Sequence, residues 1–77
     1  MMADARAVIK EGMDYPHLLD RITDHDDLVT AGVNSGEMIR IALSCERHLG
    51  RALTDEELSR LATVAAVARL LAETRED

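Results

Sequence analysis

The sequence has 77 residues, and its apolar fraction of 47% is almost entirely aliphatic, because it holds one tyrosine and no phenylalanine or tryptophan. This length accommodates a single domain over residues 1–77 and leaves no room for a deep substrate cleft in so small a core. The net charge of −6 argues against nucleic acid as a partner, because phosphate binding needs a concentrated basic surface.

The sequence lacks the signals of membrane insertion, export and disulfide formation. No apolar run approaches the length of a membrane span, and the first residues lack the apolar core of a signal peptide. Cys45 is the one cysteine, so no internal disulfide can form, which agrees with a reducing compartment. We therefore expect a cytoplasmic protein with no membrane association.

The first predicted helix runs from about residue 3 to residue 13. Ala5, Val8 and Ile9 recur on one side of it at helical spacing, with Met13 as a further candidate for the core. A turn over residues 14–16 follows, and its proline is expected to stop the helix.

A long loop separates the first predicted helix from the second. Residues 17–22 are expected to form a short helical turn, and the acidic side chains of residues 24–27 are expected to be solvated. Gly32 supplies the backbone freedom for a turn. The side chains expected to anchor this loop on the core are those of Leu18, Leu19, Ile22, Leu28 and Val33.

The second predicted helix has the clearest amphipathic pattern in the chain. Asn34 and Ser35 have the short polar side chains that open helices. Gly50 stands where a left-handed residue commonly ends a helix. Between them the apolar positions recur at helical spacing. They are Met38, Ile41, Ala42, Cys45 and Leu49.

Two shorter helices complete the predicted fold. Thr54 and Glu57 have the spacing of a capping box, which opens a short third helix carrying Leu58 and Leu61. Thr63 can cap a last helix. Its inward side is expected to present Val64, Val67, Leu70 and Leu71. The chain is thus predicted to be all-α, a small four-helix bundle with a long loop between the first and second helices.

No catalytic or metal-binding pattern in the sequence has the required spacing. The acids of residues 24–27 lack the glycine and distal glutamate of a calcium loop. The serines and the cysteine have no evident partner base. The candidate metal ligands and nucleophiles are the side chains of His17, His25, His48, Ser35, Ser44 and Cys45. We therefore expect no metal site, no catalytic residue and no enzymatic activity.

One segment does point to a function. Residues 27–39, Asp-Leu-Val-Thr-Ala-Gly-Val-Asn-Ser-Gly-Glu-Met-Ile, resemble the Leu-x-x-x-Gly-Leu-Asp-Ser-Leu motif of acyl and peptidyl carrier proteins. Residues 46–53 are similar to the Glu-x-x-Phe-Gly-x-x-Ile segment of that family, and residues 61–64 to the Thr-Val opening of its last helix. The resemblance extends over about residues 3 to 73.

The resemblance implies that Ser35 carries 4'-phosphopantetheine, transferred from coenzyme A. A helix N-terminus suits the attached phosphate, because its free amides and its dipole favour an anion. The thiol of the arm would then do the chemistry. Asn34 and Gly36 flank the serine and depart from the family pattern, which has Asp before the serine and Leu or Met after it.

The resemblance also implies protein partners. These are a phosphopantetheinyl transferase, an adenylating or acyl-loading enzyme, and a downstream acyl or aminoacyl transferase or modifying enzyme. The expected docking face lies off the core stripe of the second helix, with an apolar centre and arginines at its rim, as in peptidyl carriers. It comprises Gly36, Ile39, Arg40, Leu43 and Arg47.

The sequence thus predicts a monomeric, free-standing carrier that holds an aminoacyl or acyl thioester, with a peptidyl or aminoacyl carrier of bacterial secondary metabolism favoured. Two alternatives remain open. One is a polyketide or fatty acyl carrier. The other is an unmodified helical adaptor that binds a protein through the face around Ile39 and Leu43.

Overall fold

The computed structural model of the protein describes residues 2–74. Over this range it contains four α-helices and one 3₁₀ helix, η1, and no strand. The elements in chain order are α1 (Met2–Glu11), η1 (Pro16–Arg21), α2 (Ser35–Leu49), α3 (Asp55–Ser59) and α4 (Val64–Thr74). The all-α bundle predicted from the periodicity is therefore confirmed.

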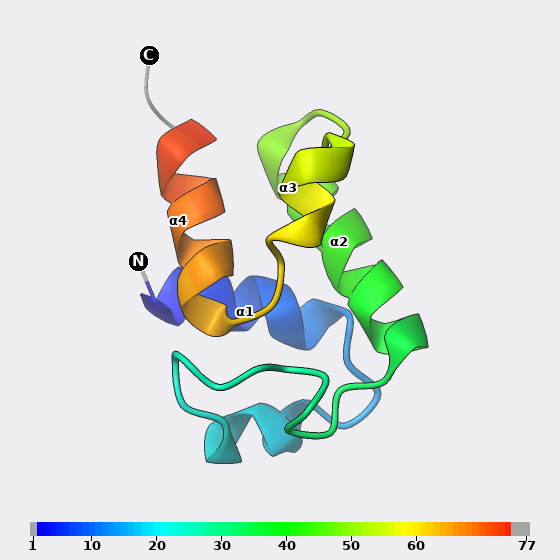
Figure 1. Ribbon diagram of the computed structural model, residues 1–77, viewed down its shortest axis with the longest axis vertical. Helices are drawn as coiled ribbons and strands as arrows, with labels where there is room; N and C mark the ends of the chain where they lie inside the picture. Colours follow the sequence, from blue (N-terminus) through cyan, green and yellow to red (C-terminus); the bar gives the residue numbers. More distant parts are fainter. Residues whose placement is uncertain (1, 75–77) are drawn as a thin grey trace.

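The helices are arranged around α1, which packs against both α2 and α4. In Figure 1, α2 and α4 rise on opposite sides of α1, and α3 lies at one end of the molecule. η1 and the loop that leads to α2 lie at the other end, so the first turn of α2 is on the loop side. None of the described helices is long and apolar enough to cross a membrane.

One apolar core joins all parts of the fold. Its fully buried members include Ile9 of α1, Leu19 of η1, Ile41 of α2 and Val67 of α4. The predicted loop anchors Leu28 and Val33 are also buried, whereas Leu18 is half-buried and packs against the core. The predicted short helical turn over residues 17–22 is confirmed as η1, which begins and ends one residue earlier.

The first helix ends at Glu11, two residues before its predicted end. The amides of Gly12 and Met13 bond to the carbonyls of Ile9 and Lys10, three residues back, which is the tightened last turn of a helix. Gly12 lies against the backbone of α2, where an added Cβ would be 2.6 Å from the Ile41 amide nitrogen. Glycine is therefore what allows α1 to cross α2 so closely.

The predicted helix ends are confirmed where local chemistry sets them. Gly50 has a φ of 75° and caps α2 in the left-handed conformation. Thr54 and Glu57 form a capping box at α3. The Thr63 hydroxyl accepts from the Ala66 amide at 3.0 Å at the start of α4. Of the two leucines predicted on the third helix, Leu58 lies in α3 but is exposed. Leu61 is buried but lies past the end of α3 at Ser59, so its predicted place in that helix is wrong.

Candidate functional site

Ser35 is the first residue of α2, and its side chain is exposed. The residue before it, Asn34, is the N-cap in an extended conformation, and its side chain accepts from the Glu37 amide at 2.7 Å. The first amides of a helix have no partner within the helix, and the dipole makes this end partly positive. An anionic group on the Ser35 oxygen would thus lie in a favourable field.

Glu37 is a buried carboxylate beneath this turn, with 4% of its surface exposed. Its Oε1 accepts from the Asn34 amide at 3.0 Å and its Oε2 from the Asp14 amide at 2.8 Å. These amides, with lesser contributions from Arg40 and the Tyr15 amide, hold the pKa of Glu37 below its ordinary value of 4.5. The charged carboxylate thus fastens the start of α2 to the segment between α1 and η1.

Sequence reasoning did not single out Glu37 as a site residue, although a signal was present. Asn34 and Glu37 have the spacing of a capping box, the same pattern that was recognised at Thr54 and Glu57. The contact with Asp14 had no such signal, because it joins residues 23 positions apart. The Asn34 side chain caps the helix as expected.

The predicted docking face lies on the outer side of α2, next to Ser35. Ile39 and Leu43 are exposed, by 63% and 50%, and Gly36 is exposed as well. Arg40 donates to the Gly12 carbonyl at 3.1 Å and to Asp14 at 2.8 Å.

Arg47 lies further along the same face and donates to Glu11 at 3.2 Å. Both docking-face arginines therefore pair with acids near the end of α1, which offsets their charge. The exposed apolar side chains of this face therefore lie beside arginines that form ion pairs with acids.

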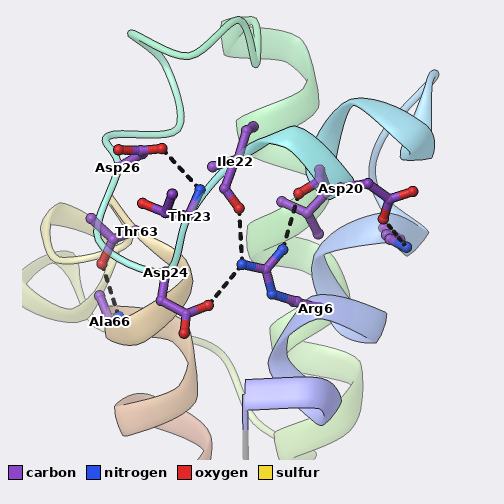
Figure 2. A network of polar contacts seen from close by, with 10 residues as sticks. Arg6, Asp20, Ile22, Thr23, Asp24, Asp26, Thr63 and Ala66 are labelled. Atoms are coloured by element: carbon purple, nitrogen blue, oxygen red, sulfur yellow. Dashed lines mark hydrogen bonds and ion pairs between the residues drawn. The ribbon is translucent and has the colours of Figure 1, made fainter.

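The loop before Ser35 is held by Arg6 of α1. Figure 2 shows its guanidinium between the Ile22 carbonyl, at 2.9 Å, and the Asp24 carboxylate, at 2.7 Å. It also donates to the Leu19 carbonyl at 3.0 Å. The expectation that all acids of residues 24–27 are solvated is thus wrong for Asp24, because Arg6 pairs with it.

The same loop is also attached to α4 and to the residues before it. The Asp24 carbonyl accepts from the Ala65 amide at 2.9 Å, and the Leu28 amide donates to the Ala62 carbonyl at 2.8 Å. Asp26 and Asp27 stay exposed and cap local turns through the amides of Thr23 and Thr30. The loop that precedes the serine is therefore tied to α1 and to α4.

Glu11 joins α1 to the second half of α2. It accepts from the Ser44 hydroxyl at 2.5 Å and lies 3.2 Å from His48. The hydrogen bonds from Ser44 and His48, and then the lesser one from Arg47, lower the pKa of Glu11. Ser44 is buried, and its hydroxyl oxygen also lies 3.0 Å from the Val8 carbonyl, so the one hydroxyl proton faces two acceptors and Ser44 is a structural serine between the helices.

The remaining candidate side chains do not form a reactive centre. Cys45 is buried, and burial raises the pKa of its thiol to about 11, which keeps it protonated. His17 and His25 are exposed. Within residues 2–74, no three histidine, cysteine or acidic side chains lie close enough together to hold a metal ion.

An apolar groove of about 590 Å³ opens at the far end of α2 from Ser35. Val8 of α1, Leu49 of α2 and Leu71 of α4 line it, along with Asp4, Ala7, His48, Ala68 and Ala72. Leu49 ends α2, fourteen positions after Ser35, which is about 21 Å along a helix at ~1.5 Å per residue.

Comparison with known protein families gives a match over most of the chain. The profile of the family described as "Phosphopantetheine attachment site" matches residues 16–71, which is more than half of the chain. The matched region begins at η1 and includes the long loop, all of α2 and α3, and most of α4. No curated protein and no solved structure matches the chain.

Proposed function

Because the chain belongs to the family of carrier proteins that bear 4'-phosphopantetheine, we propose that Ser35 is the residue to which the arm is attached. The observation that carries this proposal is the exposure of Ser35 at the first position of α2, within the matched region. The capping box of Asn34 and Glu37 supports it, since it holds the turn in one conformation before any modification. When bound, the arm supplies a thiol that holds an acyl group as a thioester.

The attachment reaction needs nothing catalytic from this chain. The Ser35 hydroxyl loses its proton, a bond forms from Oγ to the phosphorus of coenzyme A that bears the pantetheine, and the bond to the nucleotide part breaks. A transferase supplies the base and the coenzyme A site. The chain contributes an accessible hydroxyl at the positive end of α2.

The experiment is incubation with coenzyme A and a broad-specificity phosphopantetheinyl transferase, followed by intact mass. The parent should gain one phosphopantetheine. Ser59→Ala, which removes another exposed helical serine, should gain it equally, whereas Ser35→Ala should not. A gain in Ser35→Ala would move the site elsewhere. An unmodified, folded parent after several transferases would favour the adaptor alternative.

For the cargo, we propose an amino acid or a short acyl group loaded by an adenylating enzyme. Support comes from the docking face, where exposed Ile39 and Leu43 lie beside Arg40 and Arg47. The position of the groove also supports an exposed cargo, because it lies at the other end of α2 from Ser35. A downstream transferase or modifying enzyme of bacterial secondary metabolism would then take the thioester.

A charge-reversal experiment tests the docking face. The double variant Arg40→Glu/Arg47→Glu should load several-fold more slowly with an adenylating enzyme, while Arg60→Glu, a reversal in an exposed ion pair after α3, should load normally. Equal loading of all three proteins would mean that this face does not dock the loading enzyme. Circular dichroism checks that the double variant is folded, because Arg40 also contacts the Gly12 carbonyl.

The apolar groove favours a second candidate, a polyketide or fatty acyl carrier whose chain enters it. Attaching a long acyl chain to the arm would then shift the amide resonances of Leu49, Ala68 and Leu71. An acetyl group would leave these resonances unchanged. Identical spectra for the long and the short chain would refute this candidate.

A further inference from the structure

Tyr15 is the one aromatic residue of the chain, and 78% of its surface is exposed. It lies in the segment between α1 and η1, just before Pro16. Its large ring contributes little to the core at that exposure. Exposed tyrosines that have a fixed backbone are frequent anchors of protein interfaces, because they bury much area at a small cost in conformational entropy.

The backbone around Tyr15 is held from both sides. Glu37 accepts a hydrogen bond from the Asp14 amide at 2.8 Å and, more weakly, one from the Tyr15 amide. Arg40 holds the Gly12 carbonyl at 3.1 Å and the Asp14 carboxylate at 2.8 Å. The Tyr15 carbonyl accepts from the Leu18 amide at 3.0 Å. A partner that binds Tyr15 would therefore find the segment already ordered.

The same contacts bring this segment to the first turn of α2. The carboxylate that accepts from Asp14 also accepts from the Asn34 amide at 3.0 Å, directly before Ser35. Gly36 leaves that turn uncovered, since an added Cβ there would meet nothing closer than the Asn34 side chain at 3.4 Å. Ile39, 63% exposed, is one turn further along. Tyr15 and Ile39 thus offer exposed apolar surface on two segments that meet at this turn.

We propose that Tyr15 and Ile39 form an apolar docking surface for the phosphopantetheinyl transferase, with Tyr15 as the anchor. The inference rests on the proposed attachment at Ser35. The geometry points to this occupant, because the Ser35 hydroxyl reaches the transferase's coenzyme A site only if that enzyme approaches the first turn of α2, to which Glu37 fastens the segment before Tyr15. The transferase needs an apolar pocket beside that site, wide enough for a tyrosine ring.

The test compares steady-state transfer of phosphopantetheine to the parent and to three variants. Tyr15→Ser should lower kcat/KM about tenfold or more, mainly through KM, as for an interface anchor. Tyr15→Phe keeps the ring and should stay within about threefold of the parent. Leu58→Ser, which removes an exposed apolar side chain on α3 at the other end of the molecule (Figure 1), should match the parent.

Thermal unfolding of each variant accompanies the rates, and the assay is run well below the lowest midpoint. A Tyr15→Ser rate equal to that of the parent, with the parent modified at Ser35, would overturn the docking inference and leave the proposed function intact. An equal loss in Leu58→Ser would overturn it too, because the effect would not be local. A folded parent that takes no arm would refute the proposed function and the docking inference together.

Discussion

Replacing Arg6 by methionine should strongly destabilise the fold. Methionine keeps an unbranched stem but removes all donors, so the carbonyls of Leu19 and Ile22 and the carboxylate of Asp24 lose their partner together. These groups hold the loop that precedes Ser35. The substitution therefore tests whether α1 positions that loop.

The magnitude follows from the three contacts and their exposure. Hydrogen bonds with a charged group contribute roughly 1.5–3 kcal/mol each when buried. The Arg6 side chain is 27% exposed and that of Asp24 is 37% exposed, so water recovers part of the loss. We expect a total decrease in unfolding free energy of about 2–4 kcal/mol, which is a large share of the stability of so small a domain.

The assay is urea and thermal unfolding followed by far-ultraviolet circular dichroism. The midpoint temperature of Arg6→Met should fall by about 10 °C or more, at roughly 4–8 °C per kcal/mol for a domain of this size. The matched control is Lys10→Met, which removes the exposed pair of α1 with Asp20 of η1 and should change stability by less than about 0.5 kcal/mol. Similar losses in the two variants would refute the reasoning.

Three further substitutions or titrations follow from the structure. Gly12→Ala should cost about 2 kcal/mol or more in urea unfolding, because its Cβ would meet the Ile41 backbone at 2.6 Å, whereas Gly36→Ala, in open helix, should be neutral or slightly stabilising; equal effects would contradict this. The pKa of Glu37 is lowered in the folded state, so the folded protein binds its proton more weakly than the unfolded chain. Its stabilising contribution should be complete above about pH 4.5 and lost as pH falls through the folded pKa, and Glu37→Gln should reduce this acid dependence in unfolding curves measured from pH 6 to pH 3. Cys45, buried and with a pKa raised to about 11, should react with a thiol reagent at least about tenfold faster in urea than in the folded protein, and equal rates would show that it is accessible.

Local sequence determined the helices and their ends. The capping box of Thr54 and Glu57, the cap at Thr63 and the left-handed Gly50 each depend on residues within a few positions of one another. Such contacts join residues that are close in the sequence, so spacing alone predicts them. The same holds for the apolar stripe of α2, and for Ser35 as the residue that opens it.

The tertiary structure alone decided what surrounds that serine. Arg6 reaches Asp24 across eighteen positions, and Asp14 donates to Glu37 across twenty-three. The contacts of Glu37 and Arg40 with the segment before Tyr15 bring that segment beside the first turn of α2. No periodicity records these pairs, because each joins residues that are far apart in the sequence. The sequence by itself therefore determined the helices and the candidate serine, while the packing of α1 decided which groups hold the site in place.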